Sequence, residues 1–243
     1  PSAGARIWPQ KTRSRRFDLG SGLRLVIFDV DGTLVDSQAD ILSAMTAAFD
    51  SVGLVVPPQD EVLGIVGLSL DIAISRLAPD VGEQRLLDMV RGYKDAYVAL
   101  RAQSGAAQSS PLYPGARSVL DHLRQAPDTL LGVATGKSRR GLDKLIEAHG
   151  LDRVFVTQQV ADHHPSKPHP SMVLQAMAET GVAPEDTVMI GDTSFDMQMA
   201  RAAGVHAIGV SWGYHPVAAL ADASHMLDKF DELPEVLSTI WSV

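Results

Sequence analysis

The sequence predicts an α/β fold, in which an open parallel β-sheet carries helices on both faces and an all-helical segment is inserted. Short apolar runs rich in β-branched residues alternate with stretches of helical periodicity. Three of the helical stretches end at a glycine, at Gly150, Gly181 and Gly204, which is a typical helix stop. Residues 38–110 contain helical patterns alone. Strands that alternate with helices become parallel neighbours joined by right-handed crossovers, and the helical block interrupts this order once.

The expected strands are short buried runs like LRLVIFD, which opens the regular part of the chain. They cover residues 23–29, 129–136, 153–157, 186–192 and 206–210. The helices expected between the later strands cover residues 116–125, 138–150, 169–181 and 194–204. Because they alternate with the strands along the chain, we expect these helices to cover both faces of one sheet.

The inserted block holds three expected helices, at 39–53, 69–78 and 82–103. It ends in the small polar segment SGAAQSSP, which is typical of a linker. We therefore expect a catalytic core formed by residues 23–37 and 111–243, and a helical cap at 38–110 over the carboxyl end of the first strand.

The first 22 residues differ from the rest, with five lysines and arginines against one acid, Asp18. We expect 1–22 to be an expression-derived leader or a segment upstream of the true start. A basic organellar presequence is the alternative interpretation, because such sequences are rich in arginine and poor in acids.

Composition limits the function further. The chain has 45% hydrophobic residues, and no apolar run approaches the length of a membrane span, so we expect no membrane partner. It has no cysteine, which excludes thiolate metal sites and is compatible with a cytoplasmic location, the one we expect. The net charge of −8 argues against general nucleic-acid binding. Monomer and homodimer both remain open.

Polar residues gather where the predicted strands end. In an open parallel sheet the carboxyl ends of the strands face one crevice, which is where ligands bind. The residues expected at this edge are Asp29, Asp31, Thr135, Lys167, Asp192 and Asp196. Clustered carboxylates repel one another unless a cation is present, and an all-oxygen ligand set selects a hard ion such as Mg²⁺.

A carboxylate that faces a phosphate ester can act as a nucleophile, and a second one nearby can act as general acid and base. We assign these roles to Asp29 and Asp31, with Gly32 allowing the chain to turn so that both face one point. Thr135, with Gly136 beside it, and Lys167 are expected to bind the phosphoryl oxygens. The expected metal ligands are Asp29, the backbone carbonyl of Asp31, and Asp192, while Asp196 orients them.

Four motifs carry a family resemblance: DVDGT, GVATG, SKPHP and GDTSFD, in this order from Leu23 onward. With them the chain resembles a phosphatase of the haloacid dehalogenase superfamily that has a helical cap, close to the phosphoglycolate phosphatase type. The resemblance implies a Rossmann-like core, Mg²⁺, an aspartyl-phosphate intermediate and a small phosphorylated metabolite as substrate. One departure is Ser171, which stands where an acid is common.

Three alternatives compete with this prediction. A sugar-phosphate mutase of the same family would have identical core motifs. A phosphoryl-binding regulator with little turnover would have the same site, although the intact Asp31 argues against it. GVATGKS, residues 132–138, imitates a phosphate-binding P-loop, but it is one residue too short between its glycines.

Specificity is expected from the cap, because only the cap faces the leaving group. The candidates are the segment GIVGLSL at 64–70 and Arg76 on the following helix, with Arg139 and Arg140 on the core side. An arginine there would favour a substrate with a carboxylate, of which 2-phosphoglycolate is the smallest. Sugar phosphates, nucleotides and pyrophosphate follow in that order.

Overall fold

The computed structural model describes residues 22–241, and most of the predicted leader (1–22) lies outside this range. Six parallel strands form one sheet in the order β3-β2-β1-β4-β5-β6. The strands are β1 (Arg24–Phe28), β2 (Thr129–Thr135), β3 (Thr157–Val160), β4 (Thr187–Gly191), β5 (His206–Val210) and β6 (His225–Leu227). The order reverses between β1 and β4, which places the end of β1 at the centre of the sheet.

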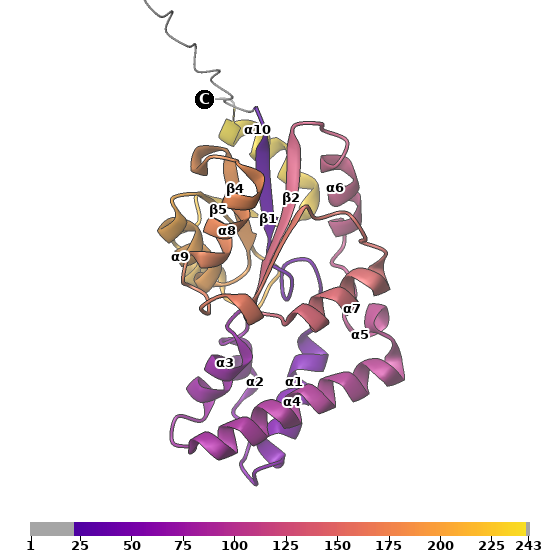
Figure 1. The fold of residues 1–243 in the computed structure, drawn as a ribbon, viewed down its shortest axis with the longest axis vertical. Coiled ribbons are helices and arrows are strands. Elements are labelled where there is room, and N and C mark those ends of the chain that lie inside the picture. Colours follow the sequence, from indigo (N-terminus) through magenta and orange to yellow (C-terminus); the bar gives the residue numbers. More distant parts are fainter. Residues whose placement is uncertain (1–21, 242–243) are drawn as a thin grey trace, which may run out of the picture.

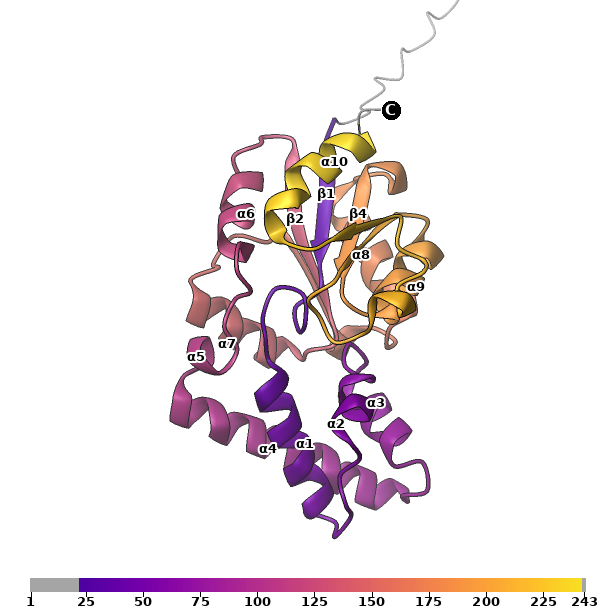
Figure 2. The same ribbon diagram turned by 180° about the vertical axis from the view of Figure 1, so that it is seen from behind.

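Helices cover both faces of the sheet (Figures 1 and 2). The helices α6 (Ala116–Leu123), α7 (Arg139–His149) and α10 (Leu233–Trp241) bury apolar side chains in the core on one face. The helices α8 (Ser171–Thr180) and α9 (Ser194–Ala203) do the same on the other face. Short 3₁₀ turns occupy Ala161–His163, Pro184–Asp186, Val217–Ala219 and Phe230–Glu232. The α/β fold class expected from the sequence is thus confirmed.

The remaining helices lie beyond the carboxyl ends of the strands, at the bottom of Figure 1. They are α1 (Gln38–Asp50), α2 (Gln59–Leu63), α3 (Leu70–Leu77), α4 (Glu83–Ser104) and α5 (Ala106–Ser109). The long helix α4 packs along α1, and the helices share an apolar core of their own around Met45, Phe49, Ile74 and Met89. These five helices, called the cap below, thus have an apolar core that is separate from the two cores beside the sheet.

The third strand does not lie where the sequence predicted it. Residues 152–154 form a turn that is followed by an irregular segment at 155–156, and Arg153 has a positive φ of 60°. Val154 and Phe155 are buried because this turn packs them under the sheet, not because they belong to a strand. The strand itself, TQQV, is polar, and Gln159 is satisfied there by donating to Thr157 Oγ1 at 2.7 Å and to Glu179 at 2.9 Å.

Other elements were not predicted at all. The short strand β6 and the helices α2 and α10 have no counterpart among the expected elements, and the segment expected as a linker contains α5. No helix within residues 22–241 is long and apolar enough to cross a membrane.

Candidate active site

The site forms at the end of the central strand β1. Asp29 is 1% exposed, and its backbone N–H continues the sheet ladder by donating to the carbonyl of Ile190 at 2.9 Å. The chain then turns at Gly32, which has a φ of +81°. A Cβ on Gly32 would overlap the Asp192 carboxylate, so glycine is required here both for the turn and for the close approach of the two segments.

Lys167 lies between two carboxylates in the interior. Its Nζ is 2.8 Å from Asp29 Oδ1 and 2.7 Å from Asp196 Oδ1, and all three side chains are almost completely buried. Burial acts to lower the pKa of Lys167, but the carboxylates of Asp196 and Asp29 raise it by more, so the pKa stays above its ordinary value. Lys167 is therefore charged, and it neutralises part of the acidic cluster.

The carboxylates remain crowded despite this lysine. Burial raises the pKa of Asp29 to about 7; the Lys167 charge lowers this pKa, and the neighbouring Asp196 raises it. Burial, followed by repulsion from Asp29 and Asp196, raises the pKa of Asp192 well above its usual range. Two carboxylates that resist ionisation in one buried spot are favourable ligands for a cation, because the cation removes their repulsion.

Three acids are close enough to share a metal ion. One oxygen each from Asp29, Asp192 and Asp196 lies within 4.8 Å of the other two. Both oxygens of Asp196 already have partners: Oδ1 accepts from Lys167 Nζ, and Oδ2 accepts from Thr193 Oγ1 at 2.6 Å in the capping box of α9. In contrast, Asp29 Oδ2 accepts no hydrogen bond from the described residues. A buried donor set made of carboxylate oxygens alone fits a hard divalent cation.

Asp192 is held from both sides. Its Oδ1 accepts from Thr33 Oγ1 at 3.0 Å, and its Oδ2 accepts from the backbone N–H of Tyr214 at 2.9 Å. Gly213 approaches so closely that a Cβ there would overlap the Asp192 side chain. The position of this carboxylate thus depends on the loop after β5 as well as on β4.

Asp31 faces a different set of groups. Its Oδ1 forms an ion pair with Lys137 Nζ at 2.7 Å and accepts a short hydrogen bond from Ser37 Oγ. Lys137 Nζ also donates to Tyr97 Oη, on the cap helix α4, at 3.2 Å. Asp31 therefore lies where core and cap meet, whereas Asp29 lies deeper inside.

A cavity of about 1200 Å³ opens between core and cap above these residues. Asp29, Asp31, Thr135 and Gly136 line its core side. Thr135 is completely buried at the end of β2, and its Oγ1 accepts from the Lys137 backbone N–H at 3.2 Å. A Cβ on Gly136 would lie 2.6 Å from the carbonyl oxygens of Gly67 and Leu68, so the cap backbone touches the core at this glycine.

The arginines expected to determine specificity lie in different places. Arg76 is positioned over the ring of Phe195, 5.5 Å from its centroid, and is not among the residues that line the large cavity. Arg139 lines the cavity, but it donates to Gln158 Oε1 at 2.7 Å and pairs with Asp143. Arg140 lines the cavity and is exposed. Most of the 64–70 segment also lines it, and Ser69 N donates to Ser166 Oγ at 2.9 Å across the cap–core boundary.

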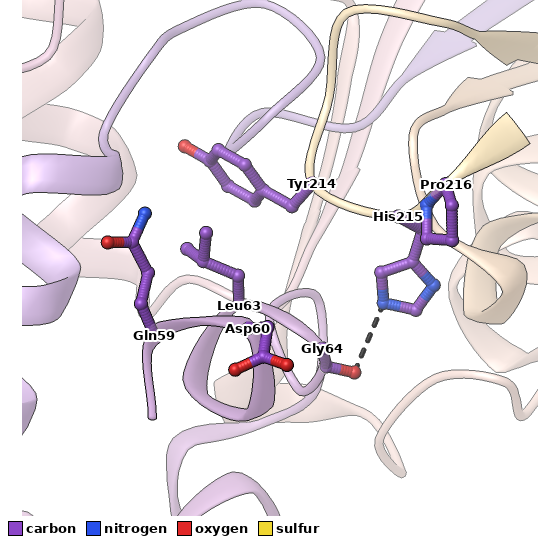
Figure 3. A pocket seen from close by; sticks show the side chains of 7 residues that line it. All are labelled: Gln59, Asp60, Leu63, Gly64, Tyr214, His215 and Pro216. Atoms are coloured by element: carbon purple, nitrogen blue, oxygen red, sulfur yellow. Dashed lines mark hydrogen bonds between the residues drawn. The ribbon is translucent and has the colours of Figure 1, made fainter. Parts of the chain in front are cut away.

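The loop after β5 contains two contacts that the sequence analysis missed. Tyr214 Oη accepts from the backbone N–H of Ser37, the residue directly before α1, at 3.0 Å. Figure 3 shows His215 beside the cap, with its Nε2 3.1 Å from the carbonyl of Gly64, at the rim of a smaller pocket of about 520 Å³. Its Nδ1 accepts from the backbone N–H of Ser194 at 3.2 Å, so Nε2 carries the proton, and burial lowers the pKa of this histidine.

Lys137, Tyr97 and Tyr214 were also missed as site residues. Lys137 stands inside the GVATGKS segment, where its position two residues after Thr135 was the available signal. Tyr97 and Tyr214 lie outside the four motifs, and only the tertiary structure brings Tyr97 to Lys137 and Tyr214 to Asp192.

Comparison with known proteins identifies the family of the chain. A family model described as "Haloacid dehalogenase-like hydrolase" matches residues 26–210. A probable phosphatase IndB of Dickeya dadantii is 37% identical over 216 residues, covering 86% of this chain and 91% of that protein. A phosphoglycolate phosphatase of Vibrio parahaemolyticus is 30% identical over 227 residues, covering 89% and 96%.

Solved structures share the fold. A predicted phosphoglycolate phosphatase from Haemophilus somnus has a TM-score of 0.78 at 24% identity, covering 89% of this chain and 99% of that one. A β-phosphoglucomutase from Clostridium difficile has a TM-score of 0.75 at 20% identity, covering 91% and 100%. The chain belongs to the haloacid dehalogenase-like hydrolases. Within that family it is a phosphatase that resembles the phosphoglycolate phosphatases.

Proposed function

We propose that this phosphatase hydrolyses a small phosphomonoester with the help of Mg²⁺, through an aspartyl-phosphate on Asp29. The observation that carries the proposal is the buried Asp29 carboxylate, which lines the large cavity and has an oxygen without a hydrogen-bond partner among the described residues. Such an oxygen is free to attack phosphorus.

The chemistry divides into two steps. An Asp29 oxygen attacks phosphorus, the ester P–O bond breaks, and the leaving alkoxide takes a proton from the Asp31 carboxyl group. Asp31, now a carboxylate, accepts a proton from water as the water oxygen attacks the phosphorus of the aspartyl-phosphate. This releases Asp29 and inorganic phosphate. Thr135, Gly136 and Lys167 hold the phosphoryl oxygens during both steps.

The metal would be held by Asp29, Asp192 and the backbone carbonyl of Asp31. When bound, Mg²⁺ offsets the negative charge of the phosphoryl group and of the carboxylates around it. Asp196 has both oxygens engaged, so its role is to fix Lys167 and the start of α9.

The first substrate to test is 2-phosphoglycolate, because phosphoglycolate phosphatases are among the relatives. We expect release of inorganic phosphate from it and from a generic aryl phosphate when Mg²⁺ is present. Chelation with EDTA should lower the rate at least about 100-fold, since a catalytic metal supplies several kcal/mol of charge stabilisation. Excess Mg²⁺ should restore the rate. Turnover that is unchanged after complete removal of divalent ions would contradict the proposal.

Product analysis also tests the two alternatives. A sugar-phosphate mutase would return phosphate on a rearranged sugar, and little inorganic phosphate would appear. A phosphoryl-binding regulator would accumulate a long-lived phosphoenzyme. The intact Asp31 favours rapid hydrolysis of that intermediate, so we expect neither result.

The close packing at Gly213 gives a further prediction. Gly213→Ala should displace the Asp192 carboxylate, because the new methyl group would overlap it. A shift of about 1 Å at a reacting centre costs on the order of 100-fold in rate. We expect a loss of this size in kcat, together with a higher Mg²⁺ concentration for half-maximal activity. Gly82→Ala is the matched control, because a Cβ there meets nothing within 4 Å, and it should leave both quantities unchanged.

A further inference from the structure

Arg101 is a cationic side chain on the cap that faces the same cavity as Asp29 and Asp31. It lies near the end of α4, and its guanidinium is 4.7 Å from the centroid of the Tyr97 ring. Nη1 donates to the carbonyl of Gly141 on the core at 3.4 Å, and Nη2 donates to Tyr97 Oη at 3.4 Å. Arg101 therefore bridges cap and core at the edge of the cavity.

The hydrogen bonds of Arg101 are incomplete. Both Nη contacts are longer than the usual 2.7–3.2 Å of an N–H···O bond. Its Nε is buried and has no acceptor in the part of the chain that the structure describes. Leaving such a donor without a partner is costly, and an anion that reached this guanidinium would complete its hydrogen bonds.

No described carboxylate lies within ion-pair distance of Arg101. The acids that line this part of the cavity have other partners. Asp143 pairs with Arg139, Asp162 accepts from the Arg139 backbone N–H, and Glu147 pairs with Lys144. Arg101 thus brings a positive charge to the cavity that the protein itself does not neutralise by a direct pair.

Arg101 is connected through two other side chains to Asp31, the acid that is expected to protonate the leaving group. Tyr97 Oη accepts hydrogen bonds from Arg101, on the same helix, and from Lys137, on the core. The Tyr97 ring stacks on Tyr93, with ring centroids 5.8 Å apart. Lys137 in turn pairs with Asp31. A continuous series of contacts therefore leads from Arg101 to the acid assigned to the leaving oxygen. The phosphoryl group itself is expected at Thr135 and Lys167.

We propose that Arg101 is the specificity residue of the cap, and that it binds a second anionic group on the alcohol part of the substrate. This inference rests on the proposed phosphatase function. The anion is a carboxylate or a second phosphate, since a guanidinium binds either through paired N–H donors. A cavity of about 1200 Å³ also admits acids longer than glycolate.

The test compares three esters of the same carbon length: 2-phosphoglycolate, ethane-1,2-diol bisphosphate and 2-hydroxyethyl phosphate. Only the first two carry a second anionic group, which is a carboxylate in 2-phosphoglycolate and a phosphate in the bisphosphate. For the wild-type enzyme we expect kcat/KM on at least one anionic ester to exceed that on the neutral ester by about 10- to 100-fold, the range of a charge-assisted hydrogen bond.

Arg101→Gln should abolish this preference, mainly by raising KM for the anionic ester, and should leave the neutral ester within about threefold. Arg101→Lys should retain part of the preference, because it keeps the charge but loses the planar pair of donors. Arg91→Gln is the matched control, since Arg91 lies on the same helix with a side chain that is 72% exposed. Arg91→Gln should leave kcat/KM unchanged on all three esters. Thermal unfolding of each variant checks that the cap is intact.

Equal losses of Arg101→Gln on charged and neutral esters would overturn the proposal, as would a wild-type enzyme without preference for either anionic ester. Hydrolysis of the neutral ester in these cases leaves the proposed phosphatase function standing. Absence of turnover on every ester, aryl phosphate included, would remove the proposed function and this inference with it.

Discussion

Asp29→Asn is expected to abolish phosphatase turnover while the protein stays folded. An amide nitrogen and oxygen of similar shape replace the carboxylate, so packing at the end of β1 is kept, but no aspartyl-phosphate can form. Loss of the nucleophile in an enzyme that uses covalent catalysis costs on the order of 10⁴-fold or more in kcat. Stability should hold, because Lys167 keeps its ion pair with Asp196, and the change removes one of the crowded charges that raise the pKa of Asp192.

The measurement is phosphate release from an aryl phosphate with Mg²⁺, together with circular dichroism and thermal unfolding. Asp36→Asn is the matched control: Asp36 belongs to the same DVDGTLVDS segment but is exposed, and its Oδ1 only accepts from the backbone N–H of Gln38. It should retain full activity. If Asp29→Asn kept more than a few per cent of wild-type turnover, the nucleophile would have to be another residue.

The residues at the strand ends were predictable because the geometry of a parallel sheet is repetitive. Once β1, β2 and β4 are recognised, Asp29, Thr135 and Asp192 must meet at one edge. Lys167 does not follow from the sheet alone, since it lies in a loop, and it was found through its motif. The structure places its Nζ 2.8 Å from Asp29 Oδ1.

Contacts between cap and core were not predictable in the same way. The contact between Tyr97 and Lys137 depends on how α4 is positioned against the core. Helical periodicity predicts the helix but not this position. Arg76 was expected at the cavity because it follows the 64–70 segment, yet α3 directs it onto Phe195. Arg101 occupies the cavity from 25 residues further along the chain.

The polar strand β3 was missed for a different reason. Hydrophobic patterning predicts burial, and it locates a strand only where buried residues are also extended. Val154 and Phe155 are buried outside any strand, whereas Gln159 is buried in a strand through hydrogen bonds to Thr157 and Glu179. Side-chain hydrogen bonds between distant elements produce no hydrophobic periodicity from which a strand could be predicted.

Among the variants proposed for this protein, Lys167→Met is expected to lower the free energy of unfolding most. Its side chain is 0% exposed and lies between two buried carboxylates, at 2.8 Å and 2.7 Å. Methionine fills a similar volume but leaves Asp29 and Asp196 without their shared cation. Breaking a buried ion pair from one side costs about 3–5 kcal/mol. Urea unfolding without added divalent ions should show a loss of this size, and Lys229→Met, at an exposed lysine, should stay within about 0.5 kcal/mol of the wild type.

A second substitution separates lost charge compensation from lost packing. In Lys167→Met combined with Asp196→Asn, one of the two uncompensated carboxylates is gone, whereas the methionine packs as before. If repulsion and desolvation of the acids cause the loss, the double variant should regain at least about 1 kcal/mol over the single variant, within the range of coupling between residues in contact. Both variants should be inactive, because Lys167 is assigned to the phosphoryl oxygens. A double variant no more stable than Lys167→Met would contradict the electrostatic account of this cluster.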